Sequence, residues 1–160
     1  MGWFSQEQCP TLDANPHVGY RLMTLADYEP VLALWRGTAG MGLRSLDDSR
    51  EGIAKFLARN PNTCFIAETP DAIVGVILAG HDGRRGYIYH AVVRERFRGR
   101  GIGKALLGLA EKALKAEGIN RAGLLVFAEN ENGNAFWEAQ GWTTRPDLTY
   151  RNKSLNEENV

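Results

Sequence analysis

A basic, glycine-rich turn at residues 97–104 is the part of this 160-residue sequence whose residue types most directly indicate chemistry. The turn reads Phe-Arg-Gly-Arg-Gly-Ile-Gly-Lys and stands between a β-rich run and a helical pattern. Glycine lets the backbone approach a ligand closely, and the free N–H groups at the start of a helix favour an anion. Arg98, Arg100 and Lys104 can add charge-assisted contacts. The turn therefore predicts a pyrophosphate-binding site.

Two common phosphate-binding motifs do not fit this turn. The dinucleotide-binding fingerprint requires a glycine where Lys104 stands. The P-loop requires a glycine at Arg98 and a serine or threonine at Ala105. A nucleotide-binding domain is therefore disfavoured, and a purely structural loop is the simpler alternative for this stretch alone.

The overall composition excludes several classes of partner. Basic and acidic residues number 19 each, so the chain has no net field to attract nucleic acid or an anionic membrane. The longest apolar stretch, residues 72–79, is far shorter than the roughly 20 residues that span a bilayer, and residues 1–10 lack a secretory pattern. Cys9 and Cys64 have neither CxxC spacing nor a histidine cluster nearby, so we expect no metal. We expect a cytoplasmic monomer or homodimer without nucleic-acid or membrane partners.

The elements that must position the turn follow from the apolar periodicity. Residues 1–17 predict a loose N-terminal extension, residues 18–153 one α/β domain, and residues 154–160 a C-terminal tail. Asp27 is placed to cap the first helix, and Gly118 closes the third. The predicted strands lie at residues 18–23, 63–68, 72–80, 87–94, 121–127, 141–145 and 148–153, and the predicted helices at residues 28–36, 48–59, 102–117 and 131–140.

The strand followed by Arg98-x-x-Gly101-x-Gly103 at the start of a helix resembles the pyrophosphate-binding motif of the GNAT N-acetyltransferase superfamily. Two further segments agree: residues 91–93 resemble the strand that contacts the pantetheine arm, and residues 130–142 resemble the helix beside the thiol and its final Gly-aromatic turn. The resemblance extends from about residue 18 to residue 153. It implies the GNAT fold, a mixed, mostly antiparallel sheet of about seven strands flanked by four helices, with a splay at the fourth strand.

The resemblance also implies a reaction. A small bacterial-type single-domain member would be an acyltransferase that moves an acetyl group from acetyl-CoA, its cosubstrate, to a primary amine by direct attack in a ternary complex. The amine acceptor would be a small molecule or a protein N-terminus. The alternative is a non-catalytic acyl-CoA-binding sensor or partner module. The cofactor-binding residues implied are Ala91, Val92, Val93, Arg98, Gly99, Arg100, Gly101, Ile102, Gly103, Lys104, Asn130, Asn132 and Trp137.

Two side chains depart from the family pattern. Many relatives carry a tyrosine that can protonate the leaving thiolate, but Trp137 stands at that position, and an indole cannot act as this acid. Some relatives carry a catalytic glutamate on the fifth strand, where Leu125 stands here. The backbone N–H of Val93 is the oxyanion donor that the resemblance implies. The usual acid and base must therefore be replaced or dispensed with.

Candidate replacements lie on the predicted strand at residues 87–94. Side chains alternate along a strand, so Tyr87 and Tyr89 share one face while Ile88 and His90 share the other. The two tyrosines match positions at which some relatives carry a base, so they are the catalytic candidates, with a plain aromatic pair as the alternative. Imidazole suits general-base chemistry, but this alternation points His90 away from the thioester. We expect His90 to pack in the core or against a helix unless a bulge reverses the alternation.

Overall fold

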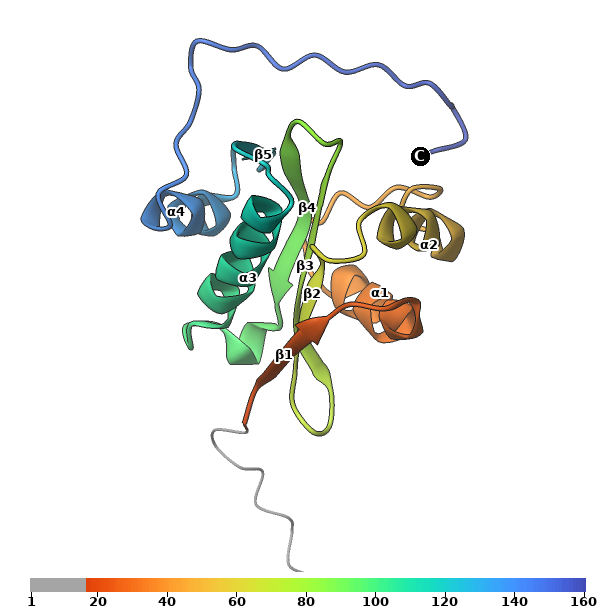
Figure 1. Cartoon of the computed structure of the whole chain (residues 1–160), viewed down its shortest axis with the longest axis vertical. Coiled ribbons are helices and arrows are strands. Elements are labelled where there is room, and N and C mark those ends of the chain that lie inside the picture. Colours follow the sequence, from red (N-terminus) through yellow and green to blue (C-terminus); the bar gives the residue numbers. More distant parts are fainter. Residues whose placement is uncertain (1–16) are drawn as a thin grey trace, which may run out of the picture.

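Strands form one sheet in the order β1-β2-β3-β4-β5 in the computed structural model, which describes residues 17–160 (Figure 1). Neighbouring strands are antiparallel except for the parallel pair of β4 and β5. The strands of the described chain are β1 (Gly19–Leu22), β2 (Phe65–Glu68), β3 (Ile73–His81), β4 (Gly86–Val93) and β5 (Ala122–Leu124). The sheet is therefore mixed and mostly antiparallel, as the sequence predicts.

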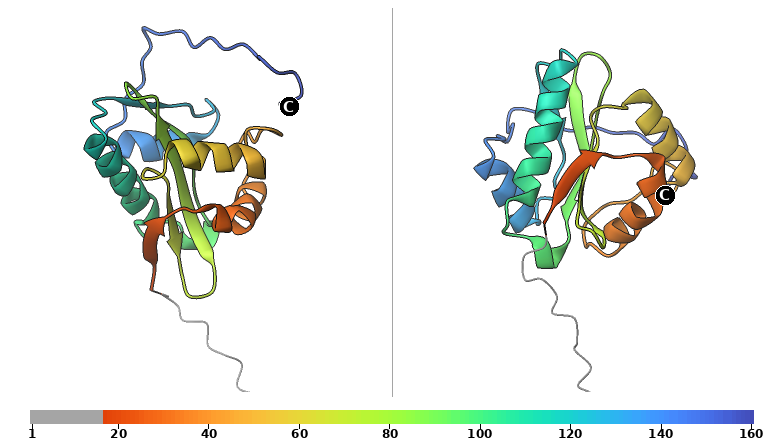
Figure 2. Two further views of the ribbon diagram at one scale, coloured as in Figure 1. Left: turned by 45° about the vertical axis from the view of Figure 1, so that its right-hand side comes forward. Right: turned by 60° about the horizontal axis from the view of Figure 1, so that its bottom comes forward.

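Helices cover both faces of this sheet (Figures 1 and 2). The first two α-helices pack on one face, and α3 with α4 covers the other. The helices of the described chain are η1 (Leu25–Asp27), α1 (Tyr28–Arg36), α2 (Arg50–Arg59), η2 (Glu95–Phe97), α3 (Ile102–Ala116) and α4 (Glu131–Ala139). The predicted α/β fold with four flanking α-helices is confirmed.

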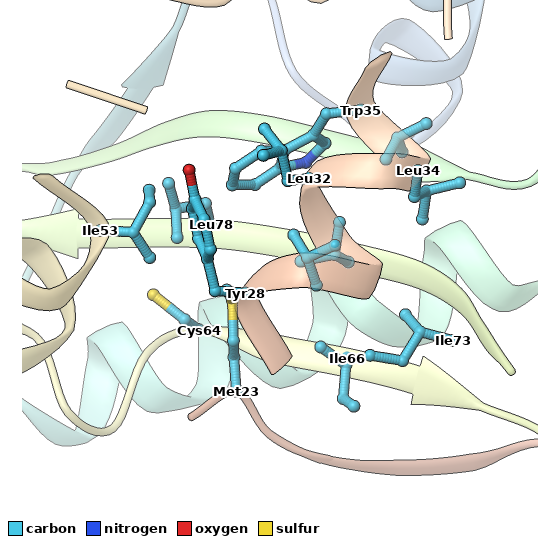
Figure 3. Packing of buried hydrophobic residues seen from close by; sticks show 13 residues of the cluster. Met23, Tyr28, Leu32, Leu34, Trp35, Ile53, Cys64, Ile66, Ile73 and Leu78 are labelled. Carbon is cyan, nitrogen blue, oxygen red and sulfur yellow. The ribbon is translucent and has the colours of Figure 1, made fainter. Parts of the chain in front are cut away.

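The helical stripes predicted from the sequence form the two cores. On the face of α1 and α2, the fully buried Trp35 and Val31 pack with Ile53 of α2 and Leu78 of β3 (Figure 3). On the other face, the α3 stripe packs against β3, where Gly75 leaves room for Leu106, which would lie 3.0 Å from a Cβ at that position. Each core therefore holds one face of the sheet against the helices that cover it.

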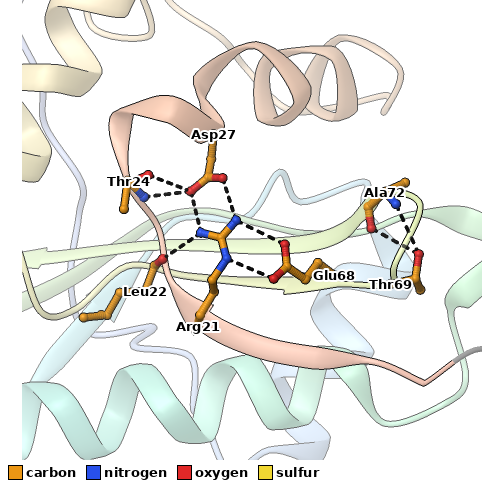
Figure 4. A network of polar contacts seen from close by, with 7 residues as sticks. All are labelled: Arg21, Leu22, Thr24, Asp27, Glu68, Thr69 and Ala72. Atoms are coloured by element: carbon orange, nitrogen blue, oxygen red, sulfur yellow. Dashed lines mark hydrogen bonds and ion pairs between the residues drawn. The ribbon is translucent and has the colours of Figure 1, made fainter.

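A buried acidic group ties β1 and β2 to the start of α1 (Figure 4). Both oxygens of Asp27 accept hydrogen bonds from Arg21, at 2.8 and 2.9 Å, and Arg21 also pairs with Glu68 of β2 at 2.9 Å. The hydrogen bond from Arg21 holds the pKa of Asp27 below its usual value. Asp27 stands at the N-cap position of α1, as the sequence predicts, but its carboxylate makes no capping bond to that helix and instead accepts the backbone N–H of Thr24 at 2.8 Å. The side chain therefore fastens η1 to the sheet.

The predicted count of seven strands is wrong, because residues 141–145 and 148–153 are not strands. Leu148 and Tyr150 are each more than 60% exposed, so this segment has no buried apolar face to hold it on the sheet. The chain after α4 runs instead over one end of the molecule to the loop after α1 (Figure 1). There Asn159 accepts the N–H groups of Leu46 and Asp47, at 3.0 and 3.1 Å.

Some predictions concern residues that the structure does not describe. The loose extension at residues 1–17 lies outside the described residues apart from His17, and so does Cys9. Cys64 is buried among apolar side chains, and burial raises the pKa of its thiol to about 12. Within residues 17–160, every helix is too short or too polar to cross a bilayer.

Candidate active site

A pocket of about 630 Å³ opens beside β4. The pairing of β4 with β5 ends at Ile88 and Leu124, so residues 89–93 have a free edge on that side. This is the splay that the sequence predicts at the fourth strand. The free edge, the turn that leads into α3, one side of α4 and the loop after α1 together enclose the pocket.

The turn before α3 forms a cradle of backbone amides at one end of the pocket. Gly99 and Gly101 have φ angles of +72° and +79°, a region that only glycine adopts readily. The first main-chain bond into α3 runs from Ala105 N–H to Gly101 C=O at 3.0 Å, so the N–H groups of residues 102–104 have no partner within the helix. No acidic residue stands in the first turn of α3. The helix start therefore presents an uncompensated positive dipole end to an anion.

Gly103 has a packing role as well. A Cβ at this position would lie 3.3 Å from the ring of Phe136 and 3.7 Å from Val93. The missing side chain thus lets α3, α4 and β4 meet closely at the base of the pocket.

All the cofactor-binding residues that the family resemblance implies line this pocket except Arg100. Arg98 lies at the mouth, and its Nε donates a hydrogen bond to the carbonyl of Val93 at 3.0 Å. The guanidinium of Arg100 instead lies over the ring of Phe97, 5.2 Å from its centre. The structure therefore distinguishes two arginines that the sequence treats alike.

The N-terminal part of α4 forms the opposite side of the pocket. Asn130 caps this helix, because its Oδ1 accepts the N–H of Gly133 at 2.9 Å, whereas Asn132 has no such bond among the described residues. Trp137 also lines the pocket and packs edge-on against Phe136 and Trp142, with ring centres 5.1 and 5.4 Å apart. The position that carries an acid in many relatives is therefore part of an aromatic wall here.

The two tyrosines predicted as catalytic candidates do not line the pocket. Tyr89 is 55% exposed and packs edge-on against Phe56 of α2, and the rings of Tyr87 and Tyr89 lie 4.7 Å apart. Burial raises the pKa of Tyr87 to about 12 and also raises the pKa of Tyr89. Both phenols therefore stay protonated at neutral pH, which makes them poor proton acceptors. Their catalytic role stays a prediction.

A bulge in β4 breaks the alternation expected around His90. Ile88 pairs with Ala79 and His90 pairs with the adjacent Leu78, so Tyr89 is an extra residue in β4. Ile88 consequently faces α3, while His90 faces α1, where its ring packs against Trp35. The expectation that Ile88 and His90 share a face is wrong because of this bulge, and His90 packs against Trp35 of α1, on the face opposite to the expected one.

Sequence reasoning missed the wall that comes from the loop after α1. Thr38, Ala39 and Met41 line the pocket, although residues 37–42 look in the sequence only like a glycine-rich helix end. The reasoning also missed the partner of His90, because Asp48 lies 42 residues earlier in the chain. No local spacing signals either feature.

A family profile and a related protein both identify the same family for this chain. The profile of the acetyltransferase (GNAT) family matches residues 29–142. An acetyltransferase of Yersinia enterocolitica is 33% identical over 128 residues, which cover 80% of this chain and 89% of the relative.

Solved structures agree on the fold. Diaminobutyrate acetyltransferase from Paenibacillus lautus, solved with L-2,4-diaminobutyric acid and coenzyme A, superposes with a TM-score of 0.66 at 24% identity, covering 79% of this chain and 75% of that one. AAC(6')-Iy, solved with the bisubstrate analogue CoA-S-monomethyl-acetylneamine, superposes with a TM-score of 0.67 at 19% identity, covering 86% of this chain and 99% of that one.

Proposed function

This chain is an acyltransferase of the acetyltransferase (GNAT) family, and we propose that it transfers an acetyl group from acetyl-CoA to a primary amine by direct attack in a ternary complex. The observation that carries the proposal is a single pocket that joins an amide cradle for phosphate to a free strand edge. The cradle suits the pyrophosphate of CoA, and the edge suits its amide-containing pantetheine arm.

The residues present fit acetyl-CoA. A Cβ built on Gly99 or Gly101 meets nothing within 4 Å, so space for the pyrophosphate remains above both residues. Arg98 and Lys104 at the same end can supply positive charge, and Ala91 to Val93 can pair with pantetheine amides as a strand would. The diaminobutyrate enzyme and AAC(6')-Iy, solved with CoA or a CoA conjugate, support the same ligand in this fold.

The chemistry needs no nucleophilic side chain. The amine nitrogen attacks the thioester carbonyl, the C–N bond forms, the C–S bond breaks, and CoA leaves as its thiol. An alkyl ammonium has a pKa of roughly 10, so forming the free amine at pH 7 costs about 4 kcal/mol, and assistance by a proton acceptor lowers that cost. The backbone N–H of Val93 is the proposed oxyanion donor. Because Trp137 cannot donate a proton, water protonates the departing thiolate.

The acceptor is proposed to be a small amine or a protein N-terminus. Diaminobutyric acid and the acetylneamine part of the bisubstrate analogue, bound by the two solved structures, are small molecules. These examples support a small amine, and an exposed pocket mouth also suits a flexible peptide terminus.

Release of free thiol from acetyl-CoA tests the proposal. We expect release to accelerate when the protein is given acetyl-CoA with at least one member of a panel of diamines, aminoglycosides, amino acids and peptide N-termini, with one acetyl group added to the amine per thiol. Calorimetry with CoA is the companion measurement. Binding of CoA without amine-dependent thiol release across the panel would instead indicate the acyl-CoA sensor.

A further inference from the structure

His90 and Asp48 form a short contact between β4 and the loop before α2. His90 Nε2 lies 2.7 Å from Asp48 Oδ1, and the other oxygen of Asp48 accepts the backbone N–H of Arg44 at 2.7 Å. The hydroxyl of Tyr28 donates to the backbone carbonyl of Asp48 at 2.9 Å. Asp48 is only 8% exposed. Asp48 is therefore held through both its carboxylate and its backbone, which makes it a rigid support for an imidazole ring.

This support fixes the tautomer of the ring. Asp48 accepts hydrogen bonds as a carboxylate, so the short contact requires a proton on His90 Nε2. Nδ1 is then the basic nitrogen. Among the described residues this nitrogen has no hydrogen-bond partner, and the His90 side chain keeps 11% of its surface exposed.

Aromatic and apolar side chains flank the ring. Trp35 from α1 packs on it with ring centres 4.9 Å apart, and Leu78 is its neighbour on β3. Tyr89, beside it in β4, is turned toward Phe56 of α2. Asp48 is the acidic group whose side chain contacts His90, and it also lines a hollow shared with Arg36, Arg44 and Arg50.

The pair lies beside the pocket, and neither side chain is among the residues that line it. His90 directly precedes residues 91–93 of β4, which form the free edge in the pocket. Trp35, in contact with the ring, stands three residues before Thr38, which lines the wall after α1. The ring therefore lies on the α1 face of the sheet, next in sequence to the free edge, and a proton could pass between it and an acceptor in the pocket only through water.

We propose that His90 is the proton acceptor for the incoming amine, through water at Nδ1, and that Asp48 is its positioning residue. The inference rests on the proposed acetyl transfer. The acceptor ammonium loses one proton to His90, which later passes it to solvent, and the free amine attacks the thioester. The second nitrogen proton is lost as the amide forms, and water delivers one proton to the thiolate, so one net proton is released per turnover.

His90→Gln is the primary test, because glutamine can keep a hydrogen bond to Asp48 but cannot accept a proton. We expect kcat/KM for the amine to fall roughly 100- to 10,000-fold while CoA affinity stays within about twofold. The pH dependence of kcat/KM should then follow the free-amine fraction alone. His81→Gln is the matched control, since His81 accepts the N–H of Gly83 in a turn and should keep the wild-type pH profile.

Asp48→Asn gives a second, independent reading. The asparagine oxygen can still accept Arg44 N–H, but its NH₂ group then faces Nε2 and moves the imidazole proton to Nδ1. The same loss of kcat/KM and the same change of pH profile are expected, with the melting temperature measured for both variants. Wild-type pH profiles in a folded His90→Gln or Asp48→Asn protein would overturn the inference. Absence of thiol release by the wild-type enzyme would instead refute the proposed function.

Discussion

The two ends of the pocket are built from different parts of the chain. The end at the turn consists mainly of backbone: positive-φ glycines, unpaired N–H groups of α3 and the free edge of β4. The other end is lined by side chains of the loop after α1, and the His90–Asp48 contact and the Tyr87–Tyr89 ring pair lie beside it on β4, outside the lining.

This difference decides which substitutions each end tolerates. A backbone site is damaged when a Cβ is added, because strain and bulk displace the amides that bind the ligand. A side-chain site tolerates changes of shape but fails when one functional atom is removed, because a buried partner is then left unpaired. CoA recognition and acceptor chemistry should therefore be separable by mutation.

Gly101→Val should give the largest effect, and it tests the backbone end. Valine is strained at a φ of +79°, and its branched side chain enters the space proposed for the pyrophosphate. We expect CoA affinity to fall roughly 100-fold or more, equivalent to losing about two charged hydrogen bonds. Calorimetry with CoA measures this loss.

Gly118→Val is the matched control for Gly101→Val. Gly118 follows the other end of α3, has a φ of +78°, and also has nothing within 4 Å of a built Cβ. The two variants therefore carry similar backbone strain and should lose similar stability, while only Gly101→Val should lose CoA. Equal CoA affinity in the two variants would show that the turn is a structural loop.

Arg98→Ala and Arg100→Ala form the next comparison, with a smaller expected effect. Arg98 lines the pocket, so its removal should weaken CoA roughly 10- to 100-fold, the range of one charged hydrogen bond. Arg100 lies over Phe97 outside the pocket, and its removal should cost less than about threefold. Pantetheine, which lacks the pyrophosphate, should bind both variants as it binds wild type. If Arg98→Ala weakened pantetheine as much as CoA, the arginine would act through its bond to Val93 instead.

The fold and the turn could be predicted because their signals are local. The α3 stripe, the glycine spacing and the change from a strand period to a helical period all lie within a few turns of chain. The two segments predicted as strands after α4 do not form strands, for a related reason. Alternation at residues 148–153 is a local pattern, but a strand also needs a face to bury, and Leu148 and Tyr150 remain exposed.

The acceptor end could not be predicted in the same way. A bulge reverses which residues share a face, and the plain alternation of β4 gives no sign that Tyr89 is the extra residue. Asp48 reaches His90 only because α1 and the following loop fold back over the sheet. Both facts depend on tertiary packing. The alternation of side chains along β4 therefore predicts the tyrosines as catalytic candidates and predicts that His90 faces away from the thioester.

Tyr89→Phe should give the smallest effect of these substitutions, and it compares Tyr89 with the neighbouring His90 as a candidate for proton transfer. The Tyr89 ring is 55% exposed and outside the pocket, and burial of part of the side chain raises the pKa of its phenol. Removing the hydroxyl keeps the ring contact with Phe56, so the local packing should survive. We expect kcat to change less than about threefold, well below the roughly 100-fold or more that a general acid or base supplies.

Steady-state kinetics with a saturating acetyl donor would separate three outcomes for Tyr89→Phe. A raised acceptor KM with constant kcat means that the hydroxyl only contacts the acceptor. If kcat instead fell roughly tenfold or more while CoA affinity stayed unchanged, Tyr89 would be the proton relay that the family resemblance suggests, and the contrast drawn with His90 would be lost. If both kcat and the acceptor KM were unchanged, the hydroxyl of Tyr89 would take no part in the reaction. Proton transfer at the acceptor end would then rest on a nitrogen that the bulge in β4, rather than the strand alternation, brings into place.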